Sequence, residues 1–226
     1  MILGLLTLAA FTWLLCRDSE PSFDGHSLSY WAGFYSDESQ DRYGSPELRA
    51  AATDALRHIG TNALPHLLKW LDYDPRPWRA DQIIRHVRLS LTTSNPSLRQ
   101  HLSRDPRLDR FNEATFALLA LGPQARPAMP DLVRMLNETN SFDFSTPATS
   151  VLVGIGDDAI PALTAATSPQ SPNRQRILSS ISLMATNQTV AAIYAPIAPT
   201  LPTMASNVLF RIAPERSTNV SFQSAK

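Results

Sequence analysis

Three stretches of this chain carry the same pair of residues, a glycine followed five positions later by a proline, between two apolar runs. The glycines are Gly60, Gly122 and Gly156, and the prolines that follow them are Pro65, Pro127 and Pro161. Successive glycines are 62 and 34 residues apart (122 − 60; 156 − 122). Because self-similarity at such a period is the signature of stacked repeats, the chain predicts an array of units about 30 to 34 residues long, with one oversized interval.

The apolar residues around each glycine predict a helix on either side of it. In the first unit, the helix before the glycine has an apolar stripe made of Ala52, Ala55, Leu56 and Ile59. After the glycine, the stripes of the first two units follow the spacing i, i+3, i+4, i+7. They are Leu64, Leu67, Leu68 and Leu71, and then Met129, Leu132, Val133 and Leu136. That spacing makes one face of an α-helix, so each unit is expected to be a helical hairpin.

The glycine and the proline each have a predicted role in the turn of the hairpin. Glycine adopts at little cost the left-handed conformation that ends a helix. Asn62 and Asp158 are predicted N-caps, which places Pro65 and Pro161 at N3, where a missing N–H costs no intrahelical hydrogen bond. In the middle unit the second helix is expected to start late, because prolines crowd the turn. These prolines are Pro123, Pro127 and Pro130.

Two weaker units follow toward the C-terminus. In the fourth unit Ala185 stands at the glycine position, and the second-helix stripe is Val190, Ile193, Tyr194 and Ile197. In the fifth unit Ala213 stands at that position, after Val208, Leu209 and Ile212. A lone hairpin cannot bury its apolar face, so each is expected to cover its neighbour. The predicted fold is all-α, a right-handed α-solenoid of about five helical hairpins with an N-terminal apolar helix.

The shared pattern A-L-x-x-[IL]-G-x-x-A-x-P-x-L resembles HEAT-type repeats in their short bacterial form, over residues 45–215. The phrase "DGHSLSYW" (24–31) is similar to the lead-in of exported bacterial HEAT-repeat proteins. This resemblance implies the architecture of an α-solenoid. It implies no single activity, because such repeats serve as scaffolds, as adaptors and, less often, as enzymes.

Residues 2–16, "ILGLLTLAAFTWLLC", form an uncharged apolar run. The run is shorter than a usual membrane-spanning helix and fits the hydrophobic region of a signal peptide. The lack of an A-x-A-like site favours a retained anchor over a cleaved signal. Cys16 leaves lipidation open, although Leu15 is bulky where lipoprotein signals carry a small residue. Together with the resemblance to exported bacterial proteins, this run implies a place at the bacterial envelope, membrane-anchored or exported, and facing the periplasm.

Four parts are expected along the chain. They are a signal or anchor segment at 1–17, a lead-in and capping helix at 18–44, the repeat array at 45–215 and a disordered tail at 216–226. Four aromatic residues of the lead-in fall at helical spacing and predict a helix that caps the first repeat, with a ligand-binding cluster as the alternative. They are Tyr30, Trp31, Phe34 and Tyr35.

Composition and motifs offer no argument for catalysis. Twenty basic and twenty acidic residues cancel, so the charge of the whole chain does not favour a nucleic-acid binder. The lone Cys16 excludes an intramolecular disulfide, and the five histidines form no H-E-x-x-H motif. The phrase "GIGDDAIP" faintly resembles a phosphate-binding loop, but its second glycine, Gly156, is the repeat glycine, so we interpret it as a turn. We expect no catalytic residue, no cofactor and no metal site.

An Arg-rich insertion at 72–112 fills the oversized interval. It holds eight Arg and five Asp, a net charge of +3 (8 − 5). Arg and Trp are enriched among the residues that dominate binding energy at interfaces. The predicted partner-binding residues are Trp78, Arg79, Arg85 and Arg88. A partner protein with an acidic surface would suit them; equally, these charges could solvate the surface or neutralise the acidic residues of 17–47.

The sequence thus predicts a non-enzymatic scaffold or adaptor for protein–protein interaction at the cell envelope. Its binding surface is expected to be the concave face lined by second helices, as in other solenoids. Two other classes stay open. One is a repeat-based enzyme of the lyase or base-excision kind, and the other is a purely structural envelope protein.

Overall fold

The computed structural model of the protein describes residues 20–35, 46–72, 106–138 and 144–214. These residues are mostly helical, so the all-α class is confirmed for them. The apolar run at 2–16, most of the Arg-rich insertion and the tail at 216–226 lie outside the described residues.

The helices follow one another in pairs along the first three units. The pairs are α3 (Pro46–Ile59) with α4 (Leu64–Leu71), α7 (Pro106–Leu121) with α8 (Met129–Asn137), and α9 (Ser145–Ile155) with α10 (Ile160–Ala166). Three further helices follow these pairs: α11 (Arg174–Thr186), α12 (Gln188–Tyr194) and α13 (Leu201–Ile212). Short 3₁₀ turns join the members of each pair.

The repeat glycines end the first helix of each pair in the left-handed conformation. Their φ angles are +63° at Gly60, +55° at Gly122 and +94° at Gly156. A Cβ on Gly60 would lie 3.1 Å from Oε1 of Gln124, and a Cβ on Gly156 would lie 3.2 Å from Cε of Met204. A Cβ on Gly122 would lie 3.7 Å from the carbonyl oxygen of Gly154. The expected left-handed glycine is confirmed in all three units, and each of these turns lies next to a later part of the chain.

The predicted N-caps at Asn62 and Asp158 are wrong. Neither α4 nor α10 has a side-chain cap, and Pro65 and Pro161 are the second residues of these helices rather than the third. An N-cap residue takes an extended backbone. Here a 3₁₀ turn leads from the glycine into the helix, and Ala63, the residue before α4, already has helical angles (φ −72°, ψ −26°).

The middle unit begins its second helix late, as predicted. Its 3₁₀ segment runs over Gly122–Ala128 and contains Pro127, and α8 begins at Met129. In the first unit α4 begins at Leu64, only four residues after the glycine. Proline removes an N–H donor and restricts the residue before it, so the crowded prolines delay the regular helix.

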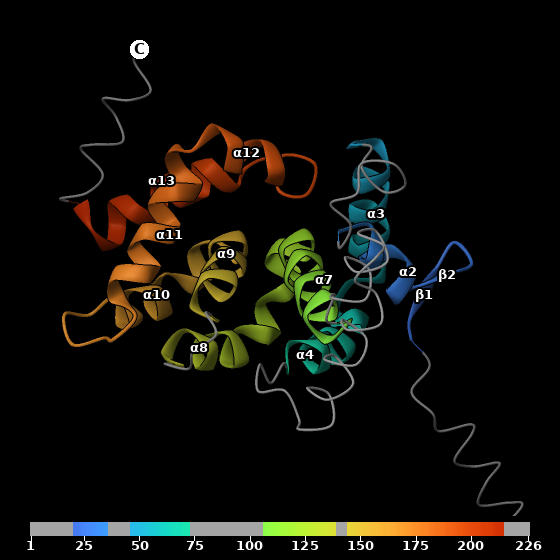
Figure 1. The fold of residues 1–226 in the computed structure, drawn as a ribbon, viewed down its shortest axis with the longest axis horizontal. Coiled ribbons are helices and arrows are strands. Elements are labelled where there is room, and N and C mark those ends of the chain that lie inside the picture. Colours follow the sequence, from blue (N-terminus) through green and yellow to red (C-terminus); the bar gives the residue numbers. More distant parts are fainter. Residues whose placement is uncertain (1–19, 36–45, 73–105, 139–143, 215–226) are drawn as a thin grey trace, which may run out of the picture.

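The first helices of successive pairs lie side by side. α3 packs against α7, α7 against α9 and α9 against α11, while α4 packs on α7 and α8 packs on α9 (Figure 1). Alanine at the contacts lets the backbones approach closely. Ala52, Ala114, Ala117 and Ala148 are all fully buried. The leucines of the second helices fill the space between the layers and complete one continuous core.

The lead-in forms a small hairpin and a short helix. Strands β1 (Ser22–Phe23) and β2 (His26–Ser27) pair antiparallel, and α2 (Leu28–Ala32) continues into a 3₁₀ turn at Gly33–Tyr35. α2 packs against α3 and α7, with both of its end residues fully buried. Of the four aromatic residues singled out in the sequence, Phe34 and Tyr35 are buried, Trp31 is half-buried and Tyr30 is 45% exposed.

The fourth and fifth units differ from their predicted form. Ala185 lies inside α11, and the chain turns two residues later at Asn187, whose side chain accepts a hydrogen bond from the N–H of Val190 (3.1 Å). α12 has no buried residue, and Ile193 is 47% exposed. Ala213 has a φ of −151°, which is not left-handed. Without a glycine the left-handed turn is costly, so the chain uses a side-chain cap instead.

Candidate functional site

The predicted partner-binding residues Trp78, Arg79, Arg85 and Arg88 lie outside the described residues. The structure therefore shows only the two ends of the Arg-rich insertion. The chain leaves α4 at Asp72 and re-enters the described part at Pro106, the first residue of α7. α4 ends the first helix pair and α7 begins the second, and the two helices pack against each other.

A Trp–Arg contact joins these two helices. The guanidinium carbon of Arg110 (α7) lies 4.8 Å from the ring centroid of Trp70 (α4), within the range of a cation–π interaction. Nη1 of Arg110 also lies 2.8 Å from Oε2 of Glu113, whose side chain is only 9% exposed. The Arg110 side chain itself is 44% exposed, so it reaches the surface of α7.

The charge of Arg110 also acts on Glu20, the first described residue. Its carboxylate accepts hydrogen bonds from the backbone N–H of Ser29 (3.0 Å) and from the Ser29 hydroxyl. Burial raises the pKa of Glu20, but the hydrogen bonds from Ser29 and the charges of Arg110 and His66 outweigh burial and hold the pKa below its ordinary value. The start of the lead-in therefore lies in the field of the same basic side chain.

Residues 194–198 of the chain lie against α3 and α7 on one side of the first-helix layer. Nη2 of Arg57 donates to the carbonyl oxygen of Ile197 (3.3 Å), and Nε of Arg57 donates to that of Ala120 (3.0 Å). The hydroxyl of Thr53 lies 3.3 Å from the carbonyl oxygen of Pro196. Ile197 is only 2% exposed. Residues about 140 positions apart thus close the described chain onto α3.

Aromatic rings continue this contact over α7. The Tyr194 ring lies 6.0 Å from that of Phe116, and Phe116 lies 6.1 Å from Tyr35. The Tyr35 hydroxyl and the Thr53 hydroxyl are 2.9 Å apart. Burial raises the pKa of Tyr35 to about 12, although the hydrogen bond with Thr53 and the charge of Arg57 act in the opposite direction. The phenol is therefore neutral over the physiological range.

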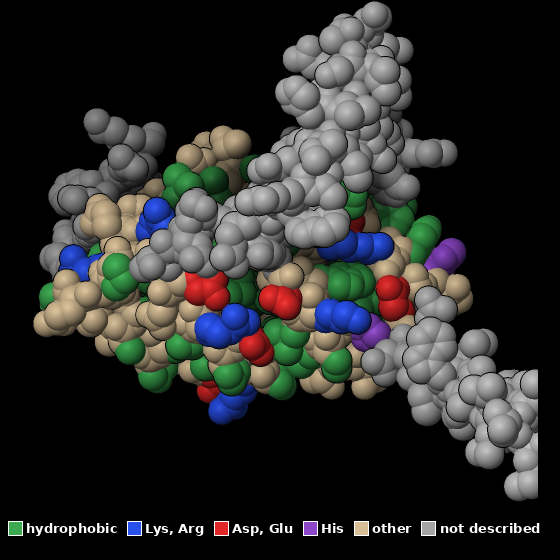
Figure 2. Space-filling model, turned by 60° about the horizontal axis from the view of Figure 1, so that its bottom comes forward, with side chains coloured by type: hydrophobic (Ala, Val, Ile, Leu, Met, Phe, Trp, Pro, Cys, Tyr) green, Lys and Arg blue, Asp and Glu red, His purple; other side chains and the backbone are tan. Residues whose placement is uncertain are grey.

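The opposite side of the layer, which carries α4 and α8, presents charged side chains. Arg134 of α8 pairs with Asp131 (3.6 Å) and with Glu138 (3.3 Å), and Arg126 pairs with Asp158 across two units (3.1 Å). The Arg126 and Arg134 side chains are each more than 60% exposed. Figure 2 shows basic and acidic side chains interspersed with apolar ones on this side. Exposed pairs of this kind add little to stability and leave the charges open to a partner.

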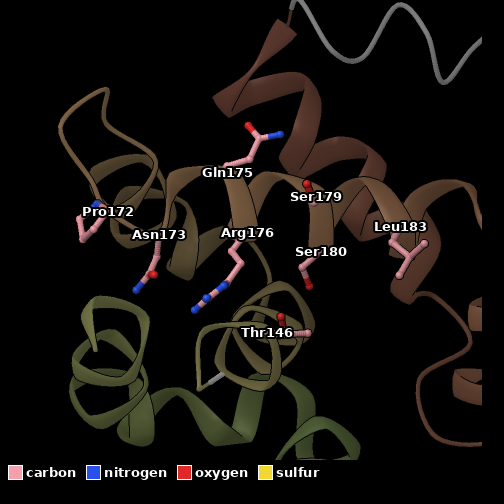
Figure 3. A pocket seen from close by; sticks show the side chains of 8 residues that line it. All are labelled: Thr146, Pro172, Asn173, Gln175, Arg176, Ser179, Ser180 and Leu183. Carbon is pink, nitrogen blue, oxygen red and sulfur yellow. The ribbon is translucent and has the colours of Figure 1, made fainter. Parts of the chain in front are cut away.

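A pocket of about 600 Å³ lies between the start of α9 and α11 (Figure 3). Six of its side chains are Thr146, Asn173, Arg176, Ser179, Ser180 and Leu183. Nδ2 of Asn173 donates to the carbonyl oxygens of Leu136 and Glu138, both at 2.8 Å, and so ties α11 to the end of α8. No carboxylate, imidazole or thiol is among the described residues that line the pocket, so these residues offer hydrogen bonds but no general base.

Among the described residues, no group of three or more His, Cys, Asp and Glu side chains could hold a metal ion. Within the same ranges, no helix has both the length and the apolar character needed to cross a bilayer.

Sequence reasoning missed the residues that close the chain on itself. Thr53 interrupts the apolar stripe of α3, and this polar residue on a buried face was the one local signal of a special contact. Arg57 and Tyr194 gave no signal, because their partners lie far away in the sequence. Trp70 lies two residues before the predicted insertion and Arg110 lies near its end, but their contact depends on how α4 packs on α7.

Comparisons of the chain with protein-family models, with curated proteins and with solved structures find no match.

Proposed function

We propose that this chain is a right-handed α-solenoid of HEAT-type hairpins that acts as a non-enzymatic scaffold or adaptor for another protein at the bacterial envelope, membrane-anchored or exported through residues 2–16. The stepwise packing of α3, α7, α9 and α11 supports the repeat architecture. The glycine turns support it too, because the turn at Gly60 approaches Gln124 of the next unit. A stack of this kind presents an extended surface, which is the usual means by which solenoids bind proteins.

The observation that carries the choice of surface is the contrast between the two sides of the first-helix layer. On one side, residues 194–198 already occupy α3 through Thr53 and Arg57. The other side, with α4 and α8, exposes charged and apolar side chains together, as Figure 2 shows. The second-helix side is therefore the proposed binding surface.

The Arg-rich insertion extends this surface in our proposal. Its residues 73–105 connect α4 to α7 along the chain, and its last residues, from Pro106, form the start of α7 and include Arg110, which contacts Trp70. Eight Arg against five Asp give the stretch a net positive charge, which favours a protein partner with an acidic surface. Charge complementarity of this kind steers association and weakens as salt rises.

The test is charge reversal within the insertion. Trp78→Ala and the triple variant Arg79→Glu, Arg85→Glu, Arg88→Glu are compared with a control that reverses equal charge elsewhere, at Arg211, Arg216 and Lys226. Proteins crosslinked to the full chain in its native membrane fraction are identified by mass spectrometry, at low and at moderate salt, beside a thermal melt. We expect one protein to be lost from the triple variant and retained by the control, with both melts unchanged.

Two results would contradict the proposal. One is a protein retained by the triple variant at all salt concentrations, because the insertion would then not contribute to binding. The other is the reproducible absence of any crosslinked protein under conditions in which the chain is folded, which would favour a purely structural role.

A further inference from the structure

The β1–β2 hairpin and α2 present an exposed layer of aromatic rings. Tyr30 is 45% exposed and Phe23 is 36% exposed. The His26 ring stacks on Tyr30 with centroids 4.0 Å apart, and Tyr30 meets the edge of Trp31 at 5.1 Å. Phe23 stacks on His58 of α3 at 4.7 Å. We call the five residues His26, Tyr30, Trp31, Phe23 and His58 the aromatic layer.

The fold holds this layer in place from beneath. Leu28 and Ala32 of α2 are fully buried against α3 and α7, so the outward side chains of α2 face away from the core. Nε1 of Trp31 donates to the carbonyl oxygen of Phe23 (3.1 Å), which fixes the hairpin to the helix. The hairpin turns at Asp24 and Gly25, both at positive φ. Packing and hydrogen bonds therefore hold the exposed rings in fixed positions on the core.

The position of the layer along the chain argues for its occupant. The apolar run of residues 2–16 ends at Cys16, and Phe23 follows only seven positions later (23 − 16). Seven residues span at most about 25 Å, so the layer stays within that distance of the end of the run. Trp and Tyr are enriched at the membrane–water interface, where their rings meet lipid and their polar atoms meet water.

We infer that the aromatic layer is a membrane-contact surface that lies at the level of the lipid headgroups and orients the helical array on the bilayer. This inference rests on the membrane attachment in the proposed function. The contact is aromatic rather than electrostatic, because the lead-in around the rings carries the acidic side chains Glu20 and Asp24 and no described Lys or Arg. Contact with lipid is therefore expected to persist as salt is raised, unlike the partner contact proposed for the Arg-rich insertion.

The experiment uses the full chain in zwitterionic lipid vesicles that contain lipids brominated near the headgroup. Trp31 becomes the single tryptophan after Trp13→Phe, Trp70→Phe and Trp78→Phe. In the matched control, Trp31→Phe is added and Phe210→Trp supplies the probe, because Phe210 is 67% exposed on α13. Figure 1 shows α13 at the opposite end of the molecule from the hairpin. Flotation of the vesicles reports membrane attachment separately.

We expect the chain to float with the vesicles and Trp31 to be quenched at least twofold more than the probe at position 210, at low and at moderate salt. Equal quenching of the two probes in a chain that floats would overturn the membrane contact while leaving attachment intact. Trp31 shielded from brominated lipid and from soluble acrylamide alike would indicate a protein occupant and would also overturn it. A chain that does not float would contradict attachment, and the inference with it.

Discussion

The glycine turns and the C-terminal helices show two ways to join helices in one chain. At Gly60, Gly122 and Gly156 a left-handed residue ends one helix, and a 3₁₀ turn starts the next. After α11 the chain has no such glycine and turns at Asn187 with a side-chain cap. α12 then buries no residue of its own, and the segment after it folds back onto α3. Successive helix pairs pack side by side after the glycine turns, whereas the turn at Asn187 precedes the segment that returns to α3.

The largest expected effect is at the point where the C-terminal segment is anchored. Ile197 is 2% exposed, so Ile197→Ala should lower the free energy of unfolding by about 2 to 5 kcal/mol through lost burial and a cavity. Ile193→Ala is the matched control, because Ile193, four residues earlier in α12, is 47% exposed. It should change stability by less than about 0.5 kcal/mol. Equal denaturant midpoints for the two variants would show that Ile197 does not anchor the segment.

The next effect concerns the glycine turns. Gly156→Val should destabilise by about 2 to 3 kcal/mol, because a β-branched residue is strained at positive φ and its Cβ would crowd Met204. Ala185→Val is the matched substitution in α11, and it should cost less than about 1 kcal/mol because its backbone is helical. Unchanged thermal unfolding of both Gly60→Val and Gly156→Val would refute the role given to the turns.

The third effect is a loss of stability at alkaline pH. The pKa of Tyr35 is raised to about 12 in the folded chain, against 10.0 for an unperturbed tyrosine. The unfolded chain therefore loses this proton first, so stability is complete below pH 10 and falls by about 2 kcal/mol as pH rises through 12. Tyr35→Phe should remove this part of the pH dependence. An alkaline unfolding profile that is the same with Phe at position 35 would contradict the assignment.

The smallest expected effect comes from Arg57, and it tests the contact between α3 and residues 194–198. Arg57→Met should cost about 1 to 2 kcal/mol, because the carbonyl oxygens of Ala120 and Ile197 lose their donor. Hydrogen exchange should rise in residues 194–198 and in α3 together. The control is Arg134→Met on α8, whose ion pairs are exposed, and it should leave exchange in both segments unchanged. Faster exchange in one segment alone would mean that the two are not coupled.

Local patterns predicted the part of the fold that local physics decides. The spacing of glycine and apolar residues predicted the helix pairs, the left-handed turns and the late start of α8, because helix ends depend on the residues nearest to them. The N-caps failed because a 3₁₀ turn, which the pattern did not reveal, replaces the extended residue that a cap needs. The return of residues 194–198 to α3 was not predictable, since Thr53 and Arg57 bond to backbone oxygens that every residue has.

The candidate site also has a part that the sequence predicted and a part that only the fold reveals. The sequence singled out Trp78 and three arginines by composition, and their geometry lies outside the described residues. The contact of Trp70 with Arg110 depends on the packing of α4 on α7, which only the fold reveals. The aromatic residues of the lead-in were read as a capping helix, but the helical spacing did not show that Tyr30 would stay exposed while Tyr35 became buried.

The contact of residues 194–198 with α3, on which the proposed choice of the second-helix side as binding surface rests, can be tested most directly by a distance in solution. Spin labels are placed at Asp54→Cys and Ala195→Cys, after Cys16→Ser removes the native thiol. Each label is one Cα step of about 3.8 Å from Thr53 or Pro196, which are in contact. Electron paramagnetic resonance should show one short distance with strong dipolar broadening. A long or broad distribution in the folded chain would mean that residues 194–198 do not cover α3, and it would contradict the account.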